Sequence, residues 1–164
     1  KFSYNPNPTL EDIDEEISAW VEWSDTYPHV IVLDNLMDVL TADDSDLRAQ
    51  KAVLLEAKTW ARHTGAAIFV LHHMTEAIGS PTEPSPRKAI QNKVAHTPET
   101  VLSVAVDGDE FKISVVAARN GRQDPSGREY VSLRAVPERN RFEPWTRVPS
   151  IPVPAYRPWE KDDD

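Results

Sequence analysis

Apolar residues recur at helical spacing through the acidic N-terminal part of the chain. They stand three or four positions apart, at Leu10, Ile13, Ile17, Trp20 and Val21. This period places them on one face of an amphipathic helix. Thr9 is a suitable N-cap, because Asp12 stands three residues later and can complete a capping box. The turn signal Tyr27-Pro28 is expected to end this helix.

Two continuous apolar runs flank a longer segment with helical periodicity. The runs cover Val30–Leu33 and residues 66–71, and each is typical of a strand buried on both faces. The segment Asp46–Thr64 is predicted to be a helix, with Ser45 or Asp46 as its N-cap and Gly65 as its end. Strand, helix and strand in this order predict a βαβ unit with parallel strands.

The pattern changes after residue 71. Residues 73–88 are rich in proline and polar groups and predict a long loop, followed by a short helix from Arg87 to about Ala95. Residues 101–106 and 111–116 are two strands joined by the turn Asp107-Gly108-Asp109, which predicts a β-hairpin.

Two segments complete the pattern. Another strand is expected over residues 130–135. Residues 148–164 carry four prolines and an acidic terminus, and are expected to form an extended or disordered tail.

Composition narrows the class of protein. A chain of 164 residues with 40% hydrophobic and 27% charged residues predicts one globular domain. The absence of cysteine excludes a disulfide framework, a zinc–thiolate site and a cysteine nucleophile. No run of about 18 apolar residues occurs, so no membrane span is expected, and a cytoplasmic location fits. Because the chain begins with neither methionine nor an apolar signal core, we expect it to start inside a longer parent.

Charge is spread unevenly along the chain. The formal net charge is −9, and the first 46 residues hold twelve acidic residues against one basic residue. This acidic balance argues against a protein that coats nucleic acid over its whole surface, but it permits a basic nucleic-acid site confined to one loop. A cluster next to the proline-rich loop contains three basic residues and a histidine: Arg87, Lys88, Lys93 and His96. They could follow a phosphate backbone or form a solvated helix face.

Asp34 follows the first apolar run directly. Four apolar residues followed by Asp form the Walker B pattern, in which the carboxylate holds a magnesium ion, usually through water. Asp34 thus lies at the carboxyl end of the predicted strand, and open α/β sheets bind their ligands at the carboxyl ends of their strands. A structural cap is the alternative interpretation. The next residue is Asn35 rather than Glu, so a catalytic base beside Asp34 is missing.

His72 and His73 follow the second apolar run. A histidine at this strand end could bind a γ-phosphate and sense its loss, and adjacent residues of a strand point to opposite faces. An ordinary strand-end pair is one alternative. A metal site in which one of the two joins Asp34 and His63 is another.

Arg119-Asn120-Gly121 follows the hairpin. An arginine at a strand end could act as an arginine finger on a neighbour's phosphate, although Asn-Gly is also a strong turn signal. None of the five glycines belongs to a G-x-x-x-x-G-K-S/T phosphate loop. The chain by itself is therefore expected not to hydrolyse ATP.

The order of these features resembles the ATPase domain of DnaB-type hexameric replicative helicases, in the RecA-like superfamily. The resemblance covers residues 1–147 and includes the stretch 91–106 that leads into the hairpin. Arg119-Asn120-Gly121 with Pro125-Ser126-Gly127 is similar to the arginine-finger motif, and Arg141-Phe142 to the last strand. The implied fold is α/β: a RecA-like, mostly parallel sheet with flanking helices and a C-terminal β-hairpin. It would be a partial domain that lacks the Walker A segment.

The resemblance also implies roles for individual residues. Asp34 would be the Walker B ligand of Mg²⁺, and His73 rather than His72 would sense the γ-phosphate of ATP. Arg119 would act on the nucleotide of the adjacent subunit in a homo-hexamer. The region 73–96 would face single-stranded DNA, with phosphate contacts from Arg87, Lys88 and Lys93. The Walker A Lys and the catalytic Glu would lie upstream.

Two departures from the family pattern concern the finger. Ala117 stands where the family has a Lys, and residues 122–124 are an insertion, in which Arg122 could compensate. A RecA-like recombinase or regulatory ATPase is an alternative within the superfamily. A non-catalytic RecA-like interaction module is an alternative of another class.

Overall fold

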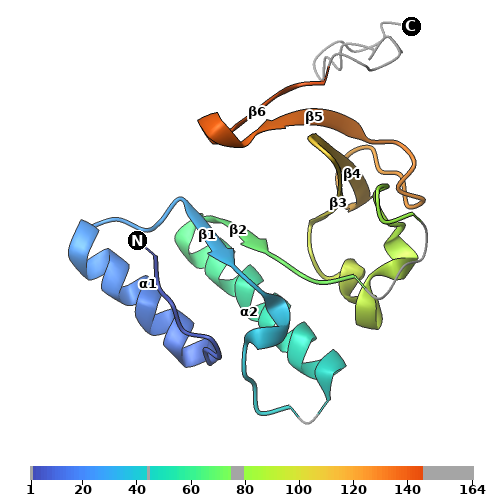
Figure 1. Cartoon of the computed structure of the whole chain (residues 1–164). Coiled ribbons are helices and arrows are strands. Elements are labelled where there is room, and N and C mark those ends of the chain that lie inside the picture. The colour runs from blue at the N-terminus through green and yellow to red at the C-terminus, as the bar shows by residue number, and fades with distance from the viewer. Residues whose placement is uncertain (1, 44, 75–79, 146–164) are drawn as a thin grey trace, which may run out of the picture.

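The chain folds into a parallel strand pair with two α-helices and a separate antiparallel sheet (Figure 1). The computed structural model describes residues 2–43, 45–74 and 80–145, with the backbone alone at 91–93. The predicted tail 148–164 lies outside the described residues. The helices and strands are α1 (Leu10–Ser24), β1 (Val30–Leu33), α2 (Asp46–Thr64), β2 (Ala67–Val70), β3 (Thr100–Asp107), β4 (Glu110–Ala118), β5 (Val131–Val136) and β6 (Arg141–Pro144). Four 3₁₀ helices connect them: η1 (Leu36–Asp38), η2 (Arg87–Ala89), η3 (Gln91–His96) and η4 (Pro137–Arg139).

Both predicted α-helices form, and their N-caps are the predicted ones. α1 ends at Ser24 with Asp25 as its C-cap, before the predicted turn at Tyr27-Pro28. The Thr9 hydroxyl accepts a hydrogen bond from the backbone N–H of Asp12 at 3.1 Å. The Asp12 carboxylate in turn accepts one from the backbone N–H of Thr9 at 2.8 Å. Ser45 caps α2, which ends at Gly65 in the left-handed conformation. Local capping chemistry therefore sets the bounds of α2.

Strands β1 and β2 pair in parallel, which confirms the predicted βαβ unit. Their register runs from Val30 opposite Ala67 to Leu33 opposite Val70. The prediction that both strands are buried on both faces is wrong. Val30, Val32 and Phe69 are 55%, 58% and 53% exposed, because the described helices cover only the other face of the pair.

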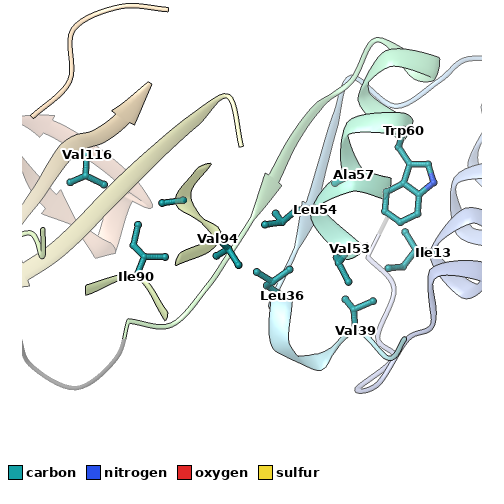
Figure 2. Close-up of a cluster of buried hydrophobic side chains, with 11 residues drawn as sticks. Ile13, Leu36, Val39, Val53, Leu54, Ala57, Trp60, Ile90, Val94 and Val116 are labelled. Carbon is teal, nitrogen blue, oxygen red and sulfur yellow. The ribbon is translucent and has the colours of Figure 1, made fainter. Parts of the chain in front are cut away.

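The hydrophobic core lies on the covered face and extends to the antiparallel sheet. Val53 is fully buried and Trp60 is 4% exposed. Both side chains point from α2 toward Ile13 of α1 (Figure 2). The same cluster continues through Val94 of η3 to Val116 of β4. One core therefore joins the two parts of the chain.

The antiparallel sheet has the order β3-β4-β5-β6. The predicted hairpin is confirmed, with Asp107 opposite Glu110 at its turn. The strand predicted over residues 130–135 is β5, and Arg141-Phe142 lies in β6 as the resemblance implied. The α/β class is confirmed, with parallel pairing in β1–β2 and antiparallel pairing in β3–β6.

The region predicted as one short helix forms two 3₁₀ helices instead. Ile90 separates η2 from η3 with an extended backbone, at φ −72° and ψ 120°. It forms an isolated antiparallel bridge with Met74, and its side chain is buried. Tertiary pairing therefore interrupts the helix. No helix in the described part of the chain is long and apolar enough to cross a membrane.

Replacing Trp60 with Ala should strongly destabilise the domain. The change empties a buried position between α1 and α2, and such truncations cost about 3–5 kcal/mol. Leu55 is the matched control, because it lies on the same helix and is 59% exposed. Leu55→Ala should change the free energy of unfolding by less than about 0.5 kcal/mol. Urea denaturation measures both, and equal midpoints for the two variants would contradict this core.

Candidate functional site

The carboxyl ends of β1 and β2 bring predicted site residues to one edge. Strand pairing continues past the strands, since the N–H of Leu71 donates to the Leu33 carbonyl at 2.9 Å. The N–H of Leu36 then donates to the Leu71 carbonyl at 2.8 Å. These two bonds hold Asp34 beside the chain that leads into His73. Asp34 is exposed, and its peptide bond to the next residue is cis.

Asn35 connects the two sides of this edge. Its side-chain oxygen accepts a hydrogen bond from the backbone N–H of Met37 at 2.8 Å. Its amide nitrogen donates to the Asp38 carboxylate at 2.9 Å and lies 3.4 Å from Nε2 of His73. Because an amide nitrogen only donates, Nε2 of His73 is the acceptor in this contact. His73 is exposed whereas His72 is half-buried, as expected for neighbours on opposite faces.

The alternative metal site of Asp34, His63 and a strand-end histidine is not formed. Nε2 of His63 lies 3.0 Å from the Tyr27 hydroxyl, and both residues precede the strands. Asp34 follows a four-residue strand, which spans roughly 13 Å. In residues 2–43, 45–74 and 80–145, no group of three or more His, Asp or Glu residues could hold a metal ion.

Arg119 follows β4 directly and is held by Glu99. Its Nε lies 3.4 Å from the Glu99 carboxylate, and its side chain is 53% exposed. Its Nη2 also donates to the His96 carbonyl at 3.5 Å. Glu99 pairs in addition with Lys58 of α2 at 3.0 Å. The hydrogen bond from Lys58, followed by the charge of Arg119, lowers the pKa of Glu99.

The structure does not bring Arg119 to the edge that carries Asp34 and His73. Within the described residues its side-chain partners are Glu99 and His96. Ala117, where the family has a Lys, is 9% exposed. Arg122 is 80% exposed and pairs with Glu129 at 2.7 Å.

A second group of predicted residues lies on η2, beside the turn that follows Asp124. The backbone N–H of Arg87 donates to the Pro125 carbonyl at 3.0 Å. The two segments line an open pocket of about 690 Å³, with Arg87 and Lys88 on one side and Arg128 on the other. The side chain of Lys93 lies outside the described part.

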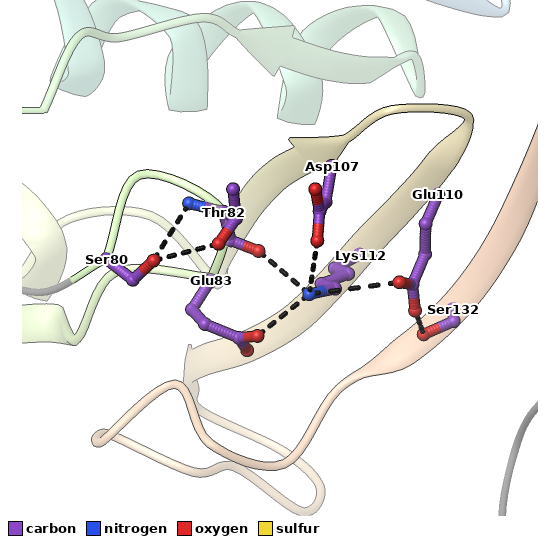
Figure 3. Close-up of polar contacts among 7 residues, drawn as sticks. All are labelled: Ser80, Thr82, Glu83, Asp107, Glu110, Lys112 and Ser132. Carbon is purple, nitrogen blue, oxygen red and sulfur yellow. Dashed lines mark hydrogen bonds and ion pairs between the residues drawn. The ribbon is translucent and has the colours of Figure 1, made fainter.

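Lys112 ties the loop before η2 to the antiparallel sheet (Figure 3). Its Nζ donates to the Thr82 carbonyl at 2.9 Å and to the Glu83 carboxylate at 2.8 Å. Asp107 and Glu110 lie 3.8 and 3.9 Å from the same nitrogen. The Lys112 side chain is 5% exposed, and the hydrogen bond to Glu83 raises its pKa above the ordinary value.

Sequence reasoning missed Lys112, Glu99, Lys58 and Arg128. A signal existed for Lys112, because it alternates with Ser114 and Val116 on the buried face of β4. The partners of Lys58 and Glu99 stand far apart in sequence, so no local pattern joins them.

The fold is of the α/β class, with a parallel strand pair and an antiparallel sheet, and comparisons with known proteins show what it is similar to. Residues 2–77 match the AAA domain family. The chain is similar to a DnaB-like replicative helicase solved in work on its interactions with primase, with a TM-score of 0.70 and 12% identity. It is also similar to a second solved structure, an ATPase domain, with a TM-score of 0.69 and 12% identity. The resemblance to DnaB-like ATPase domains is thus confirmed for the fold.

Two curated relatives match most of this chain. They are the Gene 65 proteins of Mycobacterium phages D29 and L5, each 28% identical over 144 residues. The match covers 83% of this chain but only 62% and 54% of the relatives. The match to the DnaB-like helicase covers 87% of this chain and 37% of the helicase chain. The match to the second solved structure covers 85% of this chain and 52% of that structure. The chain therefore spans little more than half the length of its curated relatives.

Replacing Gly127 with Ala should displace the loop before η2. A Cβ at Gly127 would lie 2.6 Å from the Pro84 carbonyl oxygen, and the φ of Gly127 is +74°. Gly65 has the same φ but nothing within 4 Å of its Cβ position, so Gly65→Ala isolates the strain of the left-handed backbone. Gly127→Ala should cost roughly 1–3 kcal/mol more than the control by thermal or urea unfolding. Equal costs would contradict the close approach of the two segments.

Asp124 gives the turn at 124–129 a pH-dependent stability. Its carboxylate accepts hydrogen bonds from the backbone N–H of Glu129 and from Ser126, which lower its pKa from 3.8 to about 2. A depressed folded-state pKa stabilises the fold above the unfolded value, and this contribution is lost as pH falls from 3.8 toward 2. The stability difference between the wild type and Asp124→Asn should shrink across that window. Urea denaturation at several pH values measures the difference.

Ser126→Ala provides the matched control for this effect. It keeps the carboxylate and the backbone donors but removes the hydroxyl that donates to Asp124 at 2.7 Å. The pH range over which the contribution of Asp124 to stability is lost should therefore become narrower in Ser126→Ala. In Asp124→Asn this contribution should be absent at every pH. An unchanged window in Asp124→Asn would assign the pH dependence to other groups.

Proposed function

We propose that this chain is part of an ATP-dependent, DnaB-like DNA helicase, which couples ATP hydrolysis to movement along single-stranded DNA. The observation that carries the proposal is the strand edge at which Asp34 and His73 meet through Asn35. Ligands of open α/β sheets bind at such an edge. The likeness in fold to DnaB-like ATPase domains supports the same assignment.

Asp34 is proposed to hold Mg²⁺ at the phosphates of ATP. A carboxylate oxygen suits this ion, which in nucleotide sites takes one or two carboxylates together with waters and phosphates. Asp34 is exposed at the strand edge, so its carboxylate is accessible to such an ion. When bound, the ion neutralises negative charge on the phosphates. The Walker A lysine and a catalytic glutamate would come from sequence upstream of this chain.

His73 is proposed to sense the γ-phosphate. Its Nε2 accepts from Asn35, whose carbonyl oxygen and amide also bind Met37 and Asp38 of η1. In the other tautomer of the ring, Nε2–H could donate to a phosphate, and this hydrogen bond would replace the contact with Asn35. Loss of the phosphate would return the ring to Asn35. Movement of His73 is in this way coupled to η1, immediately after Asp34.

Arg119 is proposed to act on the nucleotide of an adjacent subunit in a homo-hexamer. Its side chain is half exposed at the end of β4, and its partner Glu99 is itself neutralised by Lys58. The guanidinium can therefore exchange Glu99 for a phosphate without leaving a carboxylate unpaired. Such a finger stabilises charge in the transition state.

Contacts to single-stranded DNA are proposed for the region 73–96, through Arg87, Lys88 and Lys93. Arg87 and Lys88 lie on η2 and line the open pocket. The acidic residues are concentrated elsewhere, since the first 46 residues hold twelve of them. In Figure 1, α1 and the segment of η2 and η3 lie on opposite sides of the β1–β2 pair. Local charge at η2 therefore differs from the net charge.

The natural gene product tests this proposal directly. A product that carries G-x-x-x-x-G-K-S/T upstream of Lys1 and hydrolyses ATP faster with single-stranded DNA would support it. A product that begins near Lys1 would overturn it and favour a non-catalytic RecA-like module, because the present sequence holds no such motif. That module should show no change in thermal midpoint with nucleotide. A recombinase would form filaments on DNA instead of closed rings.

Arg119→Ala in the full-length protein should abolish DNA-stimulated ATP hydrolysis and leave nucleotide affinity nearly unchanged. Fingers of this kind contribute about 10³–10⁵ in kcat. Arg139→Ala is the control, because it removes the same charge at η4, away from β4. Steady-state ATPase assays and fluorescent-nucleotide titration measure the two properties. Loss of nucleotide binding in Arg119→Ala would count against a finger that acts in trans.

A further inference from the structure

The open pocket beside η2 is built from two segments that are distant in sequence. Residues 80–88 form one wall and residues 125–128 the other. The Arg87–Pro125 backbone hydrogen bond and the close approach of Gly127 to Pro84 hold the walls together. Arg128 therefore faces the same 690 Å³ of space as Arg87 and Lys88.

The three cations of this pocket differ from the arginines around them. Four arginines in β5, β6 and the segment after β4 each pair with a carboxylate: Arg119, Arg122, Arg134 and Arg141. Within the described residues, no carboxylate lies within ion-pair distance of Arg87, Lys88 or Arg128. Three positive charges thus share one open pocket without an internal counter-ion.

Two carboxylates of the pocket walls, Glu83 in the lining and Asp124 next to it in sequence, already have partners. Glu83 lines the pocket but accepts the hydrogen bond from buried Lys112. Asp124 accepts hydrogen bonds from the backbone N–H groups of Ser126 and Glu129 and from the Ser126 hydroxyl. Neither carboxylate forms an ion pair with any of the three cations.

We propose that this pocket binds the phosphodiester backbone of single-stranded nucleic acid through Arg87, Lys88 and Arg128, and that the Lys112–Glu83 pair holds its walls in position. This inference rests on the proposed function and adds Arg128 as a contact and Lys112 and Glu83 as positioning residues. Cations spaced along an open pocket, on two segments, suit a chain of phosphates. A single phosphate would need convergent donors.

The positioning role follows from where Lys112 lies. It is nearly fully buried in β4, and it donates to both the backbone and the side chain of the loop, at Thr82 and Glu83. Arg87 lies four residues after Glu83, so the loop cannot shift without moving the cations. A buried ion pair that loses one partner leaves an uncompensated charge, which favours keeping the loop docked.

Arg128→Ala in the full-length protein tests the contact. Fluorescence anisotropy with a labelled oligothymidylate, over a series of KCl concentrations, gives the slope of log K against log salt. Loss of one phosphate contact should reduce this slope by about 0.7 for a single strand. Arg139→Ala removes the same charge at η4 and should leave the slope unchanged. Equal slopes in the two variants would overturn the role of Arg128.

Glu83→Gln tests the positioning role, because a purely electrostatic role and a positioning role predict opposite changes in the affinity for the oligonucleotide. The substitution removes a negative charge from the pocket wall, so a purely electrostatic pocket would bind the oligonucleotide more tightly. If the ion pair positions the loop, the same substitution weakens binding although it removes a negative charge from the pocket wall. Circular dichroism and the thermal midpoint show that the variant is folded. Tighter binding by folded Glu83→Gln would overturn the positioning role.

The remaining outcomes separate this inference from the proposed function. A wild-type protein that does not bind the oligonucleotide at all would remove the nucleic-acid part of the proposed function. Binding that falls in Arg87→Ala but not in Arg128→Ala would remove only this inference. Inorganic phosphate that competes more strongly than KCl of equal ionic strength would overturn the backbone assignment in favour of a single-phosphate site. Competition equal to that of KCl supports the backbone.

Discussion

Parallel pairing of β1 with β2 is the constraint on which the strand-edge site depends. Residues before the strands and residues after them end up at opposite edges, which separates His63 from Asp34. The pairing holds because α2 connects the strands and buries Val53 and Trp60 against them and α1. A slip of the register would move Asp34 away from His73. The core of α2 therefore acts on the site at a distance.

A charge buried in the antiparallel sheet plays the corresponding part for the basic pocket. An unpaired ammonium in the position of Lys112 would be costly, so the sheet stabilises the loop that supplies Glu83 and Thr82. The same charge lies 5.4 Å from the centre of the Tyr130 ring. The loop before η2 therefore supplies the hydrogen-bond partners that the buried Lys112 of β4 needs.

Features with local causes could be predicted from the sequence, and features with distant causes could not. The ends of α2 were predictable because caps act within one turn. Asp34 and His73 could be placed at one edge because each follows an apolar run, and parallel strands end together. The break at Ile90 comes from pairing with the distant Met74, and the exposed face of β1 depends on which elements cover it. Arg128 gave no signal, because its position beside η2 depends on how the turn at 124–129 is organised.

Strand order in the two sheets has a consequence for how the chain folds. Every pair in β3-β4-β5-β6 joins strands that are neighbours in sequence. The pairing of β1 with β2 instead spans a longer sequence separation, because α2 lies between the two strands. Contacts of short sequence separation form faster, because less loop-closure entropy is lost. We therefore expect the antiparallel sheet to form early in folding. The edge that carries Asp34 and His73 is then expected to be completed later, because its two strands meet only when α2, which connects them, has docked.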